Sequence, residues 1–116
     1  MAASIALAYS GSKPSNAEAE NAFRNALNLQ PDLAEANNNL GILLASRRDY
    51  SEASWYLSKA VVASPANAEV RHKLGIVLAI THDYRGAKLQ LEEALRLAPG
   101  DAGIRTDLED IHKAMR

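Results

Sequence analysis

The chain has 116 residues, and its 13 basic and 14 acidic side chains give a formal net charge of −1. This length fits a single domain, and so balanced a charge provides no broad electrostatic attraction for nucleic acid or for an anionic membrane surface. The sequence has no cysteine, which excludes disulfides and thiolate chemistry, and its few aromatic residues and many alanines favour packed helices over a sheet.

The first segment, "MAASIALAYSGS", has an apolar run that is too short to span a membrane, and it lacks the basic start of a signal peptide. We expect a soluble protein, with the cytoplasm as the favoured compartment, and a weak front helix at roughly Ala2 to Tyr9. The "GSKPS" that follows lacks the second glycine and the Gly-Lys-Ser/Thr ending of a phosphate loop, so it is interpreted as a loop between helices.

Helix start and stop signals then recur along the chain. Ser15 and Glu18 form a capping box that predicts a helix through Leu29. Asp32 and Glu35 form a similar start for the next helix, which ends at "SRRDY". Three further helices are predicted, with bounds of about Ser51 to Ala63, Asn67 to Ile80, and about Arg85 to Leu97.

The sequence repeats itself with a period of 34 residues. "LGILLASRRDY" begins at Leu40, "LGIVLAITHDY" begins at Leu74, and seven of their eleven positions are identical. Five further rows keep the same interval: Pro31, Pro65 and Pro99; Ala19, Ala53 and Ala87; Ala26, Ala60 and Ala94; Phe23, Leu57 and Leu91; Ala34, Ala68 and Ala102. Such agreement indicates an internal repeat, in which each unit is a pair of helices that buries its apolar face by stacking on its neighbours.

Two glycines are predicted to let the paired helices approach closely. Gly41 is expected to face Ala53 and Ala60 across its hairpin, and Gly75 to face the equivalent alanines one period later. The last stretch, "AGIRTDLEDIHKAMR", keeps an apolar stripe but has Glu109 where the two glycines stood, so a further helix could not pack closely there. The stripe consists of Ile104, Leu108, Ile111 and Met115. We therefore predict a solvated capping helix over about residues 102–116.

The repeating residues resemble the tetratricopeptide repeat (TPR) family. The residues that carry the resemblance are Ala34, Leu40, Gly41, Tyr50, Ala53, Leu57, Ala60 and Pro65, and then Leu74, Gly75, Tyr84, Ala87, Leu91, Ala94 and Pro99. The resemblance implies an all-α, right-handed superhelical solenoid of antiparallel helix hairpins in one domain over residues 1–116. About three units, near 1–33, 34–67 and 68–101, would precede the capping helix. Asn37 and Arg71 replace a common aromatic residue, and Leu7 and Ser10 make the first unit atypical.

The resemblance also implies a protein–protein interaction module or scaffold, in which the first helices of successive units line a concave groove. By matching position, the groove would present Glu35, Asn38, Asn39, Ile42 and Ser46, then Glu69, His72, Lys73, Ile76 and Ile80, and finally Thr106, Asp107 and Asp110. Ile42 and Ile76 would form an apolar floor, and Asn39 can both donate to and accept from a peptide backbone. The alternative is that the polar residues are simply solvated, and this is the favoured interpretation for Glu35, Glu69 and Asp107.

Some members of this family hold a C-terminal carboxylate of a chaperone in a clamp of basic and amide side chains. Only Asn39 and Lys73 match clamp positions, whereas Ser4, Ala8 and Glu69 stand where the clamp would have lysine, asparagine and lysine. Because Glu69 would repel an acidic tail, the sequence argues against chaperone-tail binding.

Other chemistry finds little support in the sequence. His72, His82 and His112 have no metal-ligand spacing and no cysteine partner, so we expect no metal site, no cofactor and no enzyme activity. Arg47 and Arg48 are interpreted as a solvated helix end.

One group of apolar residues falls outside the predicted core. Trp55 and Val62 lie seven residues apart on the second helix of their unit, and Leu89 repeats the Trp55 position. Packing against a neighbouring helix is the favoured interpretation. The other is an outer-face patch used for homo-oligomers or for docking to the rest of a larger protein. Two functions therefore stay open: a peptide-binding module, or a structural or self-association segment of a larger multi-repeat protein.

Overall fold

The computed structural model describes residues 16–116, and within this range the chain forms six α-helices and no strand. The helices are α2 (Asn16–Leu29), α3 (Ala34–Ser46), α4 (Tyr50–Ala63), α5 (Ala68–Ile80), α6 (Tyr84–Leu97) and α7 (Ala102–Ala114). All six lie within two residues of the predicted bounds. The predicted front helix and the departures at Ser4, Leu7, Ala8 and Ser10 lie outside the described residues, as does Ser15 of the first capping box.

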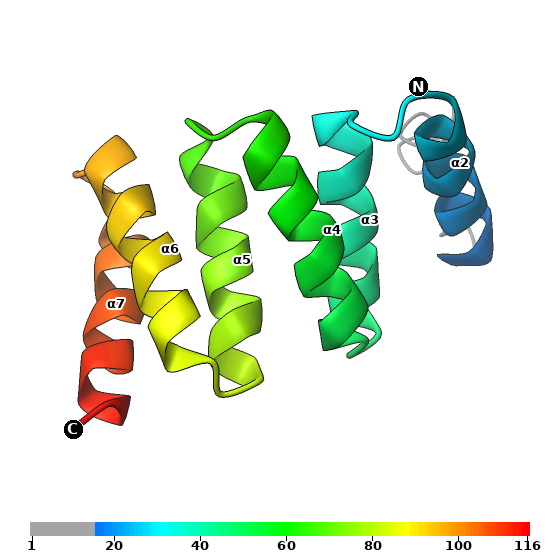
Figure 1. The fold of residues 1–116 in the computed structure, drawn as a ribbon. Helices are drawn as coiled ribbons and strands as arrows, with labels where there is room; N and C mark the ends of the chain where they lie inside the picture. The colour runs from blue at the N-terminus through cyan, green and yellow to red at the C-terminus, as the bar shows by residue number, and fades with distance from the viewer. Residues whose placement is uncertain (1–15) are drawn as a thin grey trace, which may run out of the picture.

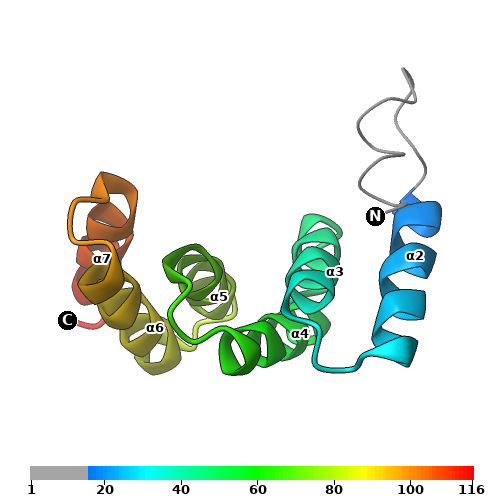
Figure 2. The same cartoon turned by 90° about the horizontal axis from the view of Figure 1, so that it is seen from above.

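The helices follow one another as an antiparallel stack in chain order (Figure 1). α3 pairs with α4 and α5 pairs with α6, while α2 packs on α3 and α7 packs on α6. Viewed from above, α3, α5 and α7 lie along one side of the stack, and α4 and α6 lie along the other (Figure 2). The predicted all-α solenoid of helix hairpins is therefore confirmed.

The repeating rows of the sequence form the core. Ala53, Ala60, Ala87 and Ala94 are fully buried, and so are the leucines between them. The small residues set the spacing of each hairpin: a Cβ on Gly41 would lie 2.7 Å from Leu57 Cγ and 3.2 Å from the Ala53 carbonyl oxygen. Gly75 meets its equivalent leucine at 2.8 Å. Each glycine thus faces the helix predicted for it, but the nearest atoms belong to a leucine side chain rather than to an alanine.

The predicted capping box at the start of α3 is wrong. The residue before the helix is Leu33, which has an extended backbone and no side-chain cap, and Asp32 lies one residue too early to serve. Asn67 and Asp101, which stand at the position equivalent to Leu33, do cap α5 and α7. Their side chains accept a hydrogen bond from the backbone N–H three residues later, at 3.2 Å and 3.1 Å. Leu33 cannot do so because it has no acceptor atom.

A polar side chain ties the start of each front helix to the proline that precedes it. The buried Asn37 donates to the Pro31 carbonyl at 3.1 Å. Arg71 and Arg105, one and two periods later, donate to the carbonyls of Pro65 and Pro99, both at 2.7 Å. Asn37 and Arg71 stand where the family resemblance leads us to expect an aromatic residue. Here a hydrogen bond from the polar side chain satisfies the carbonyl at the turn.

The interpretation of Arg47 as a solvated helix end is also wrong. Its Nη1 donates to Glu20 Oε1 at 2.6 Å, which joins the end of α3 to α2, and Arg24 donates to the other oxygen of Glu20 at 2.7 Å. The Arg47 hydrogen bond, and next to it that of Arg24, lowers the pKa of the Glu20 carboxyl below its ordinary value of 4.5. Arg48 is exposed, and with the equivalent His82 it takes a left-handed backbone, with φ of 67° and 66°, at the hairpin turn.

Candidate functional site

The predicted groove residues lie on the three helices that share one side of the stack (Figure 2). α3 carries Glu35, Asn38, Asn39 and Ile42, α5 carries Glu69, His72, Lys73 and Ile76, and α7 carries Asp107. Ile42 and Ile76 are both exposed, although each is a large apolar residue. They occupy equivalent positions one period apart, as an apolar floor requires.

A cavity of about 260 Å³ opens between α2 and α3 at one end of this surface. It is lined by Asn16, Ala19 and Phe23 of α2 and by Asn39, Ile42, Leu43 and Ser46 of α3. The sequence identified Asn39, Ile42 and Ser46. It missed the three residues of α2, two of which stand in repeating rows that were assigned to the core alone.

Two neighbouring asparagines of α3, Asn38 and Asn39, differ in the burial and the hydrogen bonding of their side-chain amides. The amide oxygen of Asn38 is buried and has no hydrogen-bond partner within residues 16–116. Asn39 is half-buried and lines the cavity, and its side-chain amide makes no hydrogen bond to another described residue. Asn39 therefore has both its donors and its acceptor available at the cavity wall.

Two residues predicted for the groove, His72 and Lys73, each contact an acidic residue. His72 Nε2 lies 2.6 Å from Asp107 Oδ2 and links α5 to α7. Lys73 Nζ lies 3.0 Å from Glu69 Oε1, one turn away on α5. In the part of the chain that the structure describes, Glu35 and Asp110 form no ion pair. The surface thus has an excess of acidic groups.

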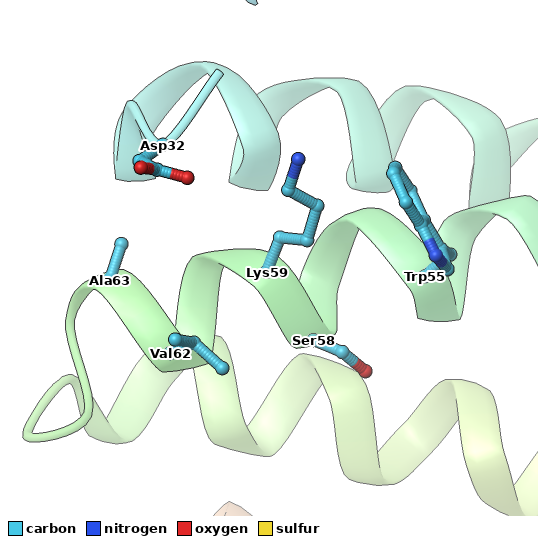
Figure 3. Close-up of a pocket in the computed structure, with 6 residues that line it drawn as sticks. All are labelled: Asp32, Trp55, Ser58, Lys59, Val62 and Ala63. Carbon is cyan, nitrogen blue, oxygen red and sulfur yellow. The ribbon is translucent and has the colours of Figure 1, made fainter. Parts of the chain in front are cut away.

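The apolar residues set apart by the sequence are exposed on the opposite side. Trp55 is 57% exposed, Val62 81% and Leu89 66%, so packing against a neighbouring helix within residues 16–116 does not account for them. A cavity of about 480 Å³ contains two of the three (Figure 3). It is lined by Asp32, Trp55, Ser58, Lys59, Val62 and Ala63, while Leu89 lies on α6 outside it.

Between residues 16 and 116, no three histidine, cysteine or carboxylate side chains gather closely enough to hold a metal ion. None of the helices formed by these residues is both long and apolar enough to cross a membrane.

Known structures share this fold. No protein-family model matches the sequence, and no curated protein matches it either. The first TPR of Spaghetti (RPAP3), solved with the HSP90 peptide SRMEEVD, matches with a TM-score of 0.81 at 17% identity, over 86% of this chain and 79% of that one. MamA matches with a TM-score of 0.83 at 23% identity, over 86% of this chain and 58% of that one. The Sgt2 TPR domain from Aspergillus fumigatus matches with a TM-score of 0.80 at 18% identity, over 98% and 74%.

These likenesses show the fold. The chain has the fold of the two TPR domains named above, an all-α solenoid of antiparallel helix hairpins, as its resemblance to that family implied.

Proposed function

We propose that the chain is a protein-interaction module that binds an extended segment of a partner protein along α3, α5 and α7. One observation carries the proposal: Asn39, whose side chain has no partner among residues 16–116, stands at the wall of an open cavity beside Ile42, Leu43 and Phe23. A peptide backbone offers N–H and C=O groups that can form hydrogen bonds with the unpartnered amide of Asn39. An apolar side chain of the peptide suits the cavity. The function is binding, with no chemical step.

The fold supports the proposal by precedent. The TPR of Spaghetti, which has the same fold, was solved with a bound peptide. That peptide ends in acidic residues, whereas the surface proposed here carries Glu35 and Asp110, which form no ion pair among residues 16–116, and its Lys73 is paired with Glu69. Because like charges repel across a groove, we expect a neutral or basic segment as the ligand rather than an acidic tail.

The test begins with random linear peptides displayed on phage and selected on the purified chain. Selected peptides are then titrated calorimetrically into the wild type and its variants. Asn39→Ala should weaken binding roughly fivefold, the equivalent of about 1 kcal/mol for a hydrogen bond. Lys73→Glu should weaken acidic peptides and strengthen basic ones, because it adds a negative charge to the surface. Both side chains lie outside the core, so helicity and melting temperature should stay unchanged.

Trp55→Ala is the matched control, since Trp55 lies on α4, away from the proposed groove. If Trp55→Ala abolished binding of the selected peptides while Asn39→Ala and Lys73→Glu left it intact, the groove proposal would be refuted. The alternative function, a structural or self-association segment of a larger multi-repeat protein, is favoured by a different observation, the exposure of Trp55 and Val62.

A further inference from the structure

The cavity between α2 and α3 lies where a helix is present in each of the next two units. There α3 packs against α4 and covers Ala53 and Leu57, which are 0% and 1% exposed, and α5 packs against α6 in the same way. The equivalent residues of α2 are Ala19 and Phe23, and both line the cavity. Among the helices of residues 16–116, α2 packs on α3 alone (Figure 1). The cavity is therefore the place where a front helix would pair with α2, and we call it the front-helix site.

The α3 wall of the front-helix site also matches a surface that is covered one period later. Leu43 of this wall is half-buried. Its equivalent on α5, Val77, is 4% exposed and belongs to the same apolar cluster as Leu40 and Leu44 of α3. An apolar residue that is buried beside the preceding front helix in one unit thus borders an opening in the unit before it.

The residues that precede α2 are placed to reach this site. Three residues separate each front helix from its partner in the complete hairpins, at 47–49 and at 81–83. The same spacing before Asn16, the first residue of α2 and itself part of the cavity wall, would end a front helix at residue 12. Residues 2–12 then match α3 from Ala36 onward. Because this segment is joined to α2 at the edge of the cavity, its effective concentration there is high.

The segment lacks the side chains that hold the other front helices in place. Leu40 and Leu44 of α3 are 0% and 1% exposed, and one period earlier the chain has Ala6 and Ser10. Burial of leucine side chains is a main source of stability for such a contact, and alanine and serine bury much less apolar surface. The segment would therefore bind α2 more weakly than α3 binds α4.

The residue that would face α2 weakens this contact further. Leu7 stands in the place of Gly41, where an added methyl group would already lie 2.7 Å from Leu57 Cγ. The residue equivalent to Leu57 on α2 is Phe23, which is larger. We propose that residues 2–12 occupy the front-helix site as a weakly held helix and compete there with the partner segment. This inference rests on the proposed function, which places an apolar side chain of the ligand in the same cavity.

The first experiment measures occupation of the front-helix site without any ligand. Hydrogen–deuterium exchange of the full chain, followed by mass spectrometry, reports the protection of the amides of residues 2–12. Ala6→Gln puts a larger polar side chain at the position of the buried Leu40, so this protection should be lost. Ala8→Gln is the matched control, because its equivalent Ile42 is exposed, and it should change nothing. A wild type without protection, or equal effects of the two variants, would overturn the proposal.

A third variant should have the opposite effect. Ala6→Leu, Leu7→Gly and Ser10→Leu together restore the residues that the second unit has at these positions. The restored segment would bury two leucines and would no longer overlap α2, so exchange within it should become much slower than in the wild type. Exchange as fast as in the wild type would show that the segment does not pair with α2, and would count against the proposal.

The second experiment tests competition, by calorimetric titration of one phage-selected peptide into the same variants. If the segment fills the site in about nine-tenths of the molecules, emptying the site should strengthen binding by about tenfold. Ala6→Gln should therefore strengthen binding, the restored variant should weaken it, and Ala8→Gln should do neither. If all three bind the peptide as the wild type does while Asn39→Ala still weakens binding, competition is refuted and the proposed function stands. If Asn39→Ala has no effect either, the proposed function fails and the competition fails with it.

Discussion

Gly41 offers a direct test of what holds the first complete hairpin together. Its α-carbon faces α4, and a methyl group added there would lie 2.7 Å from Leu57 Cγ and 3.2 Å from the Ala53 carbonyl oxygen. Carbon atoms pack best at about 3.5–4.0 Å, so the added group would overlap its neighbour by roughly 1 Å. Gly41→Ala is therefore the smallest substitution that challenges the spacing between α3 and α4.

Two opposing effects decide the result. Alanine is more favourable than glycine inside a helix by about 1 kcal/mol, whereas overpacking a core costs about 1–3 kcal/mol. Leu57 is only 1% exposed, and the overlapping Cγ is the branch point of its side chain rather than a free tip. The backbone oxygen cannot move unless α4 moves with it, and Cγ can move only if the buried Leu57 side chain changes its rotamer within a closely packed core. The free-energy cost of the overlap should therefore lie in the upper part of the 1–3 kcal/mol range. After the gain in helix propensity of about 1 kcal/mol is subtracted, Gly41→Ala should destabilise the protein by about 1–2 kcal/mol.

Thermal unfolding followed by circular dichroism measures this effect, and the expected fall in melting temperature is roughly 5–10 °C. Gly75→Ala is the matched substitution in the next hairpin, where the added carbon would lie 2.8 Å from Leu91 Cγ, and it should behave alike. In a background of Leu57→Ala, where the overlapping atom is absent, Gly41→Ala should no longer destabilise. A stabilising Gly41→Ala in the wild type would refute the reasoning, because it would mean that helix propensity wins and that the glycine does not set the spacing.

Two further predictions concern the ends of the stack. The pKa of Glu20 is lowered by its hydrogen bonds to Arg47 and Arg24, so the stability that these bonds contribute is complete above the ordinary value of 4.5 and is lost as the pH falls through the lowered pKa. Thermal melts at several pH values should show the wild type losing stability below about pH 4.5 more steeply than Glu20→Gln, and parallel curves would contradict this. Deleting residues from Gly103 onward removes Ile104, Leu108 and Ile111, which cover Leu91 and Ala94, so solubility should fall or oligomers should form. A truncated chain that light scattering shows to be a stable monomer would argue against a capping role for α7.

The fold could be predicted because packing in a repeat protein depends on local, recurring residue types. Small residues at fixed intervals imply close helix contacts, and prolines imply the breaks between units. The contacts that the sequence did not reveal join residues whose chemistry is ambiguous or whose separation follows no period. Glu20 and Arg47 are 27 residues apart, and nothing in either local pattern indicates their pairing. The spacing of Asp32 and Glu35 predicted a capping box, but the spacing alone does not show at which residue the helix begins. The residue that precedes α3 is Leu33, whose backbone is extended.

The groove positions were easier to place than to interpret. Matching residues one period apart put Asn39 and Lys73 on the same side of the stack, and the structure keeps them there on α3 and α5. Which of them is available for a ligand depends on neighbours that the repeat does not specify. Lys73 is held by Glu69 one turn away, whereas Asn39 has no described partner. The α2 wall of the cavity was missed because a residue such as Phe23 can be part of the core and still border an opening.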